Sequence, residues 1–227
     1  MPELWIFELC RNRPGISVEA ISDSECTAIF LNNYKDKTVK TLRSGVTDLL
    51  RYHGMEVVRE KGIISGIHTI DYTMADENKQ ITATYLIIAT GSEPTIPPIS
   101  GLKESGAWTS NELLESNLLL PESITIIGGG VIGVECATIL HDFGVQVRIV
   151  EMLPQLLPRM DSEIAELLKK ELMKKGIEIY TDTTVIDLSK SGDKKICRIQ
   201  TGESAMELVS DELFVAIGRG PIQQVSV

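Results

Sequence analysis

The sequence predicts an α/β fold of three layers built around a mainly parallel sheet. Two apolar runs rich in β-branched residues, 84–90 and 124–127, each stop at a glycine, as buried parallel strands do where they turn at their carboxyl ends. The second run begins an alternation of strand, glycine turn, helix and strand over residues 123–152. A chain of 227 residues is long enough for two units of this kind.

Charge and hydropathy exclude several classes of partner. The chain has 32 acidic and 22 basic residues, a net charge of −10, and no cluster of Lys and Arg, which argues against nucleic acid. No apolar run reaches the roughly 18 residues of a membrane span, because the longest weakly charged stretch, 124–140, contains three consecutive glycines and Glu135. The first ten residues, MPELWIFELC, contain the acidic Glu3 and have no basic flank or cleavage site, so we expect no secretory signal. We therefore expect a cytoplasmic protein that binds small molecules.

Cysteine and histidine spacing predicts neither a metal site nor a local redox pair, and it identifies no catalytic residue. Short ligand spacings such as Cys-x-x-Cys do not occur. The simplest interpretation is that the thiols are core or surface residues. The residues concerned are Cys10, Cys26, Cys136, Cys197, His53, His68 and His141.

The first ninety residues read as one helix and several short strands. Apolar residues at helical spacing predict a helix over 35–53. Strands are expected at 56–58, 61–65, 67–73, 79–83 and 84–90. Prolines and glycines between 95 and 121 indicate a connecting segment, where we place the domain boundary.

From residue 121 onward the elements alternate regularly. A helix is expected over 131–143, with Gly144 as its left-handed end, and a second from Asp161 to Gly176, with Asp161 as its N-cap. The expected strands are 124–127, 145–150, 177–180, 184–188, 195–200, 205–209 and 211–218.

The glycine pattern Gly128-x-Gly130-x-x-Gly133 follows a strand and opens a helix, which is the context of a Rossmann-like dinucleotide-binding turn. Gly128 permits a tight turn, Gly130 lets the backbone approach a pyrophosphate, and Gly133 lets the helix pack closely on the sheet. The helix N-terminus then offers N–H groups and a positive dipole end to phosphate. A plain glycine turn is the less favoured alternative.

Two acidic residues accompany this turn. Glu151 ends the next strand, where a carboxylate accepts hydrogen bonds from the adenosine ribose hydroxyls and repels a 2′-phosphate, so NAD is favoured over NADP. The alternative for Glu151 is a solvated strand end. Glu135 fits a functional role and an exposed helix flank equally well. Cys136 is expected to be a core residue rather than a reactive one, because the negative charge of the neighbouring Glu135 raises the thiol pKa and a thiol with a raised pKa is less reactive.

Four segments carry a resemblance to a known family. They are ATGSEPTIPPISG at 89–101, GGGVIGVECA at 128–137, VEMLPQLLPRMDSEI at 150–164 and VAIGRGP at 215–221, with weaker similarity over 41–66. At these segments the chain resembles the pyridine nucleotide-disulfide oxidoreductases, which are flavoproteins with two dinucleotide-binding domains, and most closely their dihydrolipoyl dehydrogenase branch.

The resemblance implies a set of cofactor-binding residues. Glu151 would contact the adenosine ribose of NAD, Val185 its adenine and Gly218 its nicotinamide side. Gly62 would approach the adenine end of FAD. The residues that would line the NAD pyrophosphate and nicotinamide ribose are Gly128, Gly129, Gly130, Val131, Ile132, Gly133, Val134 and Glu135. The residues that would pass near FAD are Thr90, Gly91 and Ser92.

The resemblance also implies two domains and a reaction for the full enzyme. Residues 1–120 would be a partial FAD-binding domain that lacks the FAD glycine motif and the Cys-x4-Cys redox pair, and 121–227 the NAD-binding domain. The full enzyme, expected to be a homodimer, would oxidise dihydrolipoamide with NAD+ through FAD, with a lipoyl-bearing acyltransferase of a 2-oxo acid dehydrogenase complex as partner. This chain alone is expected to be catalytically incomplete and to hold no FAD tightly. The alternatives are a mercuric reductase or NADH oxidase type and a non-catalytic dinucleotide-binding module.

Overall fold

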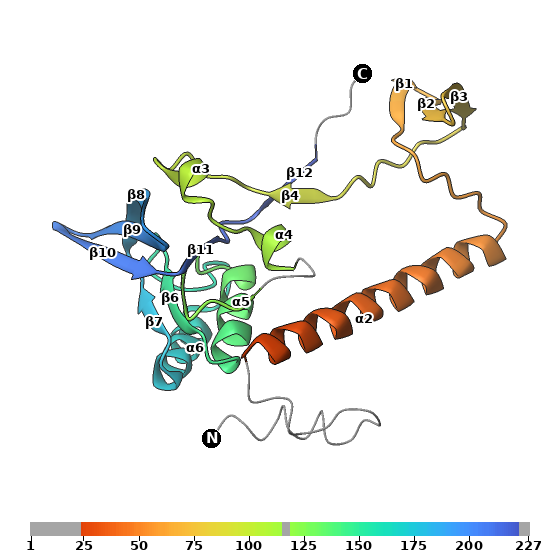
Figure 1. The fold of residues 1–227 in the computed structure, drawn as a ribbon. Helices are drawn as coiled ribbons and strands as arrows, with labels where there is room; N and C mark the ends of the chain where they lie inside the picture. The colour runs from red at the N-terminus through yellow and green to blue at the C-terminus, as the bar shows by residue number, and fades with distance from the viewer. Residues whose placement is uncertain (1–23, 115–118, 223–227) are drawn as a thin grey trace. The chain divides into compact units, whose positions relative to one another are not determined.

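The computed structural model describes residues 24–114 and 119–222 (Figure 1). It divides into two compact units. One contains Pro94–Gly218, and the other contains Lys35–Glu93 together with the described residues after Gly218. No helix of the described residues is long and apolar enough to cross a membrane.

A parallel sheet of four strands organises the Pro94–Gly218 unit. The order β11-β5-β6-β7 places the last strand in the sequence beside the first. The predicted β-turn-α-β unit is confirmed. The strands are β5 (Ser123–Ile127), β6 (Gln146–Val150), β7 (Glu178–Tyr180) and β11 (Glu212–Val215), and the helices are α5 (Val131–Asp142) and α6 (Ser162–Lys175).

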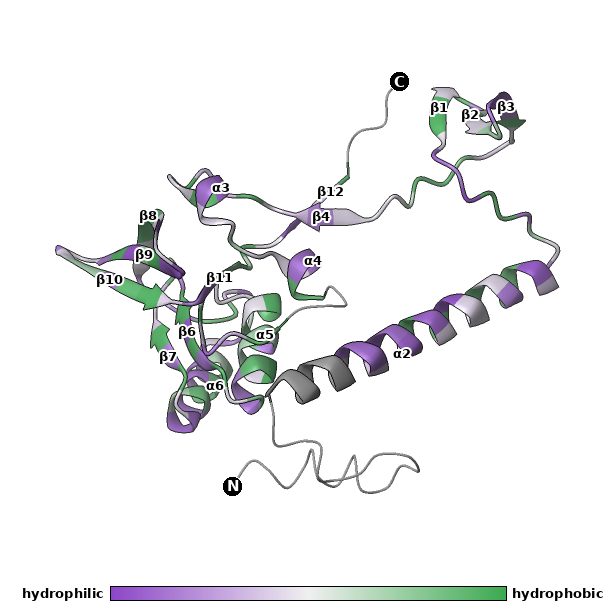
Figure 2. Cartoon of the chain, viewed as in Figure 1, coloured by the Kyte–Doolittle hydropathy of each residue, from purple (hydrophilic) through white to green (hydrophobic). Residues whose placement is uncertain are grey.

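Strands β5 and β11 of this sheet are buried on both faces, which explains their uninterrupted apolar runs. Ile124 and Ile126 pack into one cluster with Ala137 and Leu140 of α5. The opposite face of the sheet packs into a second cluster that includes Ile127. Figure 2 shows hydrophobic residues concentrated in α5 and the neighbouring strands, whereas the coloured part of α2 carries largely hydrophilic ones.

An antiparallel sheet supplies the third layer. Cys197 and Ile199 of its central strand are fully buried in the second cluster, against the parallel sheet. Gly192 and Gly202, both at positive φ, stand in its two turns. The order is β10-β9-β8, and the strands are β8 (Thr183–Ser191), β9 (Lys194–Thr201) and β10 (Ser204–Ser210).

Both predicted helix ends of α6 are confirmed. The Asp161 carboxylate accepts hydrogen bonds from the backbone N–H groups of Glu163 and Ile164, at 2.9 and 3.4 Å. Gly176 ends the helix at φ 108°. Gly144 likewise follows α5 at φ 85°. These local signals are strong because an Asp cap and a left-handed glycine each satisfy backbone groups that a helix end leaves unpaired.

The segment 95–121 is more ordered than a plain connection. It contains two short helices, α3 (Leu102–Ser105) and α4 (Ser110–Leu113), which corrects the prediction that it lacks helix. Parallel bridges join Ser100 to Asp187 and Trp108 to Phe214. The segment is therefore part of the folded unit.

Gly101 explains how closely this segment approaches the antiparallel sheet. Its φ is 76°, and a Cβ there would lie 1.7 Å from the backbone oxygen of Leu188. Only glycine fits such an approach of two backbones. The proline and glycine content that indicated a loop instead marks a tight backbone contact.

The other unit contains a long helix from Lys35 onward. The predicted helix over 35–53 is confirmed within α2 (Ser24–Tyr52). An antiparallel sheet in the order β1-β2-β3 follows, and residues 56–58 are not a strand, contrary to prediction. The strands are β1 (Ile63–Gly66), β2 (Thr69–Met74) and β3 (Glu77–Thr82), with β4 (Ser92–Pro94) paired to β12 (Arg219–Pro221).

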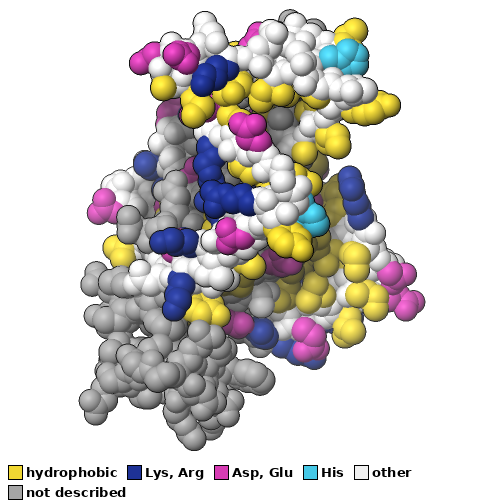
Figure 3. Space-filling model, turned by 90° about the vertical axis from the view of Figure 1, so that its right-hand side faces the viewer, with side chains coloured by type: hydrophobic (Ala, Val, Ile, Leu, Met, Phe, Trp, Pro, Cys, Tyr) yellow, Lys and Arg dark blue, Asp and Glu magenta, His cyan; other side chains and the backbone are white. Residues whose placement is uncertain are grey.

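The prediction of a buried strand over 84–90 is wrong. Tyr85 is 86% exposed and Ile87 is 91% exposed, and these residues form no strand. An apolar run becomes a strand only beside a partner strand, and none of the described strands pairs with it. Leu42 and Val46 of α2 are exposed for the same lack of a packing partner among the described residues. Exposed hydrophobic side chains are visible on the face drawn in Figure 3.

Candidate functional site

The glycine turn after β5 adopts the close packing that its pattern predicts. Gly128 has a φ of 111°, and a Cβ there would lie 2.5 Å from the backbone oxygen of Ala216. A Cβ on Gly133 would lie 2.0 Å from the backbone oxygen of Gly128. These two glycines therefore allow the turn to pack against the end of β11 and α5 to pack against the turn.

Gly130 differs from both, because a Cβ there would meet nothing within 4 Å. It is the N-cap of α5, and no side chain caps the helix at this point. The first N–H groups of a helix have no partner within the helix, and they carry its positive dipole end. Open space beside uncapped N–H groups fits a phosphate group of a dinucleotide.

Glu151 lies at the carboxyl end of β6 with its carboxylate against the turn. One oxygen, Oε2, accepts a hydrogen bond from the Gly129 N–H at 2.6 Å, and Oε1 accepts one from the Leu153 N–H at 2.8 Å. The residue is 8% exposed. Burial rules out the solvated strand end considered above and places a negative charge beside the glycine turn.

The segment that follows Glu151 also contacts Gly129, through a backbone hydrogen bond and a buried side chain. The Leu157 N–H donates to the Gly129 carbonyl at 2.8 Å. The Leu156 side chain is fully buried, and its Cδ2 would lie 2.5 Å from a Cβ on Gly129. Sequence reasoning missed both leucines, because an apolar residue in a loop has no pattern that distinguishes a packing role from exposure.

The remaining predicted residues of this unit lie in different environments. Val131 and Glu135 are exposed on α5, whereas Val134 is buried in the core and Ile132 is half-buried. Val185 is half-buried beside a bulge in β8. Gly218 is exposed at φ 124°, and its carbonyl accepts from the Thr95 N–H at 3.0 Å.

The residues that the resemblance assigns to FAD lie in the other unit. The Thr90 hydroxyl donates to the Ile222 carbonyl at 3.3 Å, and the Ile222 N–H donates to the Gly91 carbonyl at 3.2 Å. The Ser92 hydroxyl accepts from Arg219 Nε at 2.9 Å. Thr90, Gly91 and Ser92 thus form one cluster with residues 219–222. Gly62 instead lies just before β1, where a Cβ would be 2.9 Å from Ile70 Cγ2.

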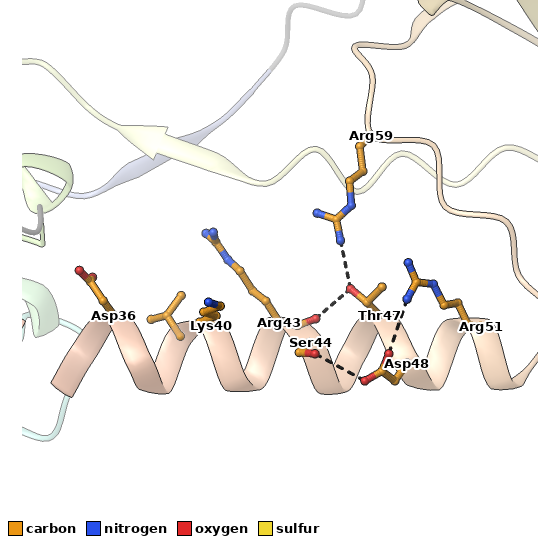
Figure 4. A pocket seen from close by; sticks show the side chains of 9 residues that line it. Asp36, Lys40, Arg43, Ser44, Thr47, Asp48, Arg51 and Arg59 are labelled. Carbon is orange, nitrogen blue, oxygen red and sulfur yellow. Dashed lines mark hydrogen bonds and ion pairs between the residues drawn. The ribbon is translucent and has the colours of Figure 1, made fainter. Parts of the chain in front are cut away.

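An open groove of about 480 Å³ runs along α2, and none of the residues that line it is a predicted site residue (Figure 4). The Arg59 guanidinium points toward α2 and donates to the Thr47 hydroxyl at 3.3 Å. Arg51 pairs with Asp48 at 3.7 Å, and both side chains are more than half exposed. This arrangement is a solvated charged face. Within the described residues, no group of three or more His, Cys, Asp or Glu could hold a metal ion.

Cys136 and Cys197 are protected from ionisation. Burial, followed by the charge of Glu135, raises the pKa of Cys136 to about 11. Burial, followed by the charge of Asp187, raises the pKa of Cys197 to about 12. Cys136 is half-buried and packs against the core cluster, as predicted.

We expect alkaline pH to destabilise the chain in part through Cys136. Its ordinary thiol pKa is 9.0 and its native pKa is about 11, so the native state holds the proton more tightly than the unfolded state. The free energy of unfolding is therefore unaffected by this thiol below pH 9.0 and falls as the pH rises toward 11. Urea unfolding across this range should show a shallower decline for Cys136→Ala. Equal slopes for the variant and the parent chain would contradict the assignment.

A parallel sheet with a glycine turn, an uncapped helix N-terminus and an acid at the end of the next strand is the arrangement of a Rossmann-like α/β unit. A family model of the pyridine nucleotide-disulphide oxidoreductases matches residues 8–226, and the chain belongs to this family. The predicted resemblance and fold class are confirmed. Proteins of this family use FAD and a pyridine nucleotide.

Several relatives match over most of the chain. It is 34% identical to the dihydrolipoyl dehydrogenase of Thermus scotoductus, over 84% of this chain and 41% of that protein. It is 37% identical to the dihydrolipoyl dehydrogenase of Acholeplasma laidlawii, and that match covers 81% of this chain and 53% of that protein. The mercuric reductase of Bacillus cereus is 28% identical to the chain, and that match covers 96% of this chain and 34% of that protein.

Among solved structures, the HOCl-induced flavoprotein disulfide reductase RclA from Escherichia coli superposes with a TM-score of 0.75 at 27% identity. The match covers 87% of this chain and 44% of that one. The chain thus spans about a third to a half of the length of these relatives.

Proposed function

We propose that the glycine turn, the N-terminus of α5 and Glu151 bind NAD(H) in preference to NADP(H). The observation that carries this proposal is the buried Glu151 carboxylate, hydrogen-bonded at 2.6 Å to the N–H of Gly129 in the glycine turn. The turn and α5 supply N–H donors for the pyrophosphate, and the adjacent carboxylate supplies acceptors for the ribose hydroxyls.

The fixed negative charge is what separates the two nucleotides. Two backbone N–H groups already bind the carboxylate, so its position is set, and its remaining lone pairs can accept from ribose hydroxyls. A 2′-phosphate brought to the same place would face a carboxylate at short range, and a like-charge contact of this kind costs several kcal/mol. The residues flanking Glu151 in sequence, Val150 and Met152, offer no compensating positive charge.

Calorimetry with the 227-residue chain tests this proposal. NADH is expected to bind at least about tenfold more tightly than NADPH, a difference of about 1.4 kcal/mol. Glu151→Ala should weaken NADH binding by about 1–3 kcal/mol, because charged hydrogen bonds are lost. It should also reduce the difference in affinity between NADH and NADPH.

Glu163→Gln is the matched control, since it removes one negative charge from an exposed position in the first turn of α6. It should leave the preference unchanged. Equal or tighter binding of NADPH to the parent chain would defeat the proposal, as would a control variant that changes the preference as much as Glu151→Ala does.

We further propose that 121–227 is the NAD-binding domain and 1–120 a partial FAD-binding domain of a dihydrolipoyl dehydrogenase, which transfers electrons from dihydrolipoamide to NAD+. Dihydrolipoyl dehydrogenases 34% and 37% identical to the chain support this assignment. The proposed partner is a lipoyl-bearing acyltransferase, and Gly62, Thr90, Gly91 and Ser92 are the proposed FAD contacts. The proposed location is cytoplasmic, and the assembly a homodimer.

Mercuric reduction is the second candidate, because the mercuric reductases of Bacillus cereus and Lysinibacillus sphaericus match 96% and 95% of the chain. A steady-state assay of the FAD-loaded protein that contains these residues separates the two candidates. The first proposal expects NAD+ reduction by dihydrolipoamide. Pyridine nucleotide oxidation that depends on Hg(II), with no turnover of dihydrolipoamide, would replace it with the second.

A further inference from the structure

We propose that Leu157 is a positioning residue for the glycine turn. Its backbone N–H holds the Gly129 carbonyl and thereby aims the Gly130 N–H at the pyrophosphate of the nucleotide. The inference rests on the proposed function, because it assigns to the segment after β6 the task of orienting a donor for that ligand.

The peptide unit between Gly129 and Gly130 links the contact with Leu157 to the ligand. The Gly129 carbonyl and the Gly130 N–H belong to the same planar trans peptide, so they point in opposite directions. The Leu157 N–H fixes the carbonyl at 2.8 Å. Among the described residues, none accepts a hydrogen bond from the Gly130 N–H, and a Cβ on Gly130 would meet nothing within 4 Å. The Gly130 N–H is therefore directed away from Leu157, at a residue that has open space beside its Cα.

The preceding peptide unit is fixed as well. The Glu151 carboxylate accepts from the Gly129 N–H at 2.6 Å, so both polar groups of Gly129 are bound by residues that follow β6. The fully buried Leu156 side chain packs directly against the Gly129 backbone. This packing prevents the segment from shifting as a body, and the turn is preorganised before any ligand arrives.

Leu157 adopts an unusual backbone conformation to make this contact. Its φ is 48°, in the left-handed region that residues other than glycine and asparagine rarely adopt. Its carbonyl accepts from the Met160 N–H at 2.8 Å, which closes a turn around it. A strained conformation persists only where surrounding contacts enforce it, and here the contact it provides is the hydrogen bond to Gly129.

Three substitutions at one position separate the backbone donor from the side chain. Leu157→Gly, Leu157→Asn and Leu157→Pro all remove the leucine side chain, but only proline also removes the N–H and cannot reach a positive φ. NADH affinity, measured by calorimetry, is expected to stay within about twofold of the parent for the glycine and asparagine variants. The proline variant should bind NADH at least about fivefold more weakly than the parent chain does, because it loses one hydrogen bond.

A purely structural role of the side chain predicts a different result, in which all three variants lose thermal stability and affinity together. That result would overturn the proposal, as would a folded proline variant that binds NADH as the glycine variant does. Hydrogen exchange of the parent chain covers the case in which the proline variant does not fold. The Leu157 amide is expected to exchange slowly and to slow further with NADH, and exchange at the rate of an open loop would overturn the proposal.

These outcomes are distinct from failure of the proposed function. If the parent chain binds neither NADH nor NADPH, the proposed nucleotide site is wrong, and the Leu157 role falls with it. If the parent binds NADH and the three variants bind it equally well, the site stands and only the positioning role is refuted.

Discussion

Gly130→Val is expected to abolish NADH binding while the chain stays folded. The valine side chain would enter the open space in front of α5, where a Cβ meets no protein atom within 4 Å. Because φ is −75° at this position, a valine fits the backbone, and as a poor N-cap it should cost no more than about 1 kcal/mol of stability. Calorimetry should show at least about a hundredfold loss of affinity, equivalent to about 2.7 kcal/mol.

Gly133→Val is the informative contrast, since it inserts the same side chain one turn further along. A Cβ there would lie 2.0 Å from the Gly128 backbone oxygen, so α5 must move away from the turn. The free energy of unfolding should fall by about 3 kcal/mol or more. If Gly130→Val stays folded and keeps its NADH affinity, the phosphates bind elsewhere.

Lys195→Met is expected to destabilise the Pro94–Gly218 unit by about 3–5 kcal/mol, the usual cost of leaving one partner of a buried ion pair without the other. Lys195 and Glu212 are 7% and 8% exposed and form an ion pair between β9 and β11. Lys195 also donates to the Gly106 carbonyl at 2.7 Å, which ties the segment after α3 to the sheet. Urea unfolding measures the loss.

Two controls show whether burial is the cause. Adding Glu212→Gln to Lys195→Met should recover most of the loss, because the unpaired charge is removed. Arg198→Met breaks the ion pair of Arg198 with Asp187, in which the arginine side chain is 49% exposed, and should cost less than about 1 kcal/mol. Equal losses from Lys195→Met and Arg198→Met would contradict the mechanism.

Local chemistry made the Pro94–Gly218 unit predictable. Asp161 and Gly176 delimit α6 by satisfying its end groups, and the strand pattern of 123–152 requires no distant information. The glycine turn was predictable because Gly128 and Gly133 each meet a steric demand that other residues cannot meet. The role of Leu157 was not predictable, since a backbone hydrogen bond to Gly129 leaves no signal in the type of residue.

Predictions that depended on distant partners succeeded less well. Residues 84–90 have the composition of a buried strand, but strand formation needs a neighbour, and Ile87 is exposed. The helix pattern of α2 predicted a helix correctly, since helical hydrogen bonds are internal to the element. The same pattern did not reveal that Leu42 is 66% exposed, because burial depends on what packs against a face.

The position of β11 has a consequence for how the chain is made. This strand is the last of the parallel sheet in sequence, yet it pairs with β5, the first, and its Phe214 bridges to Trp108. Contacts between residues this far apart in sequence form slowly, because a long loop must close before any of them is gained. During translation β5 must therefore wait, with one edge unpaired, until the ribosome has released residues 212–215. Until then the exposed edge of β5 is open to pairing with a strand of another chain.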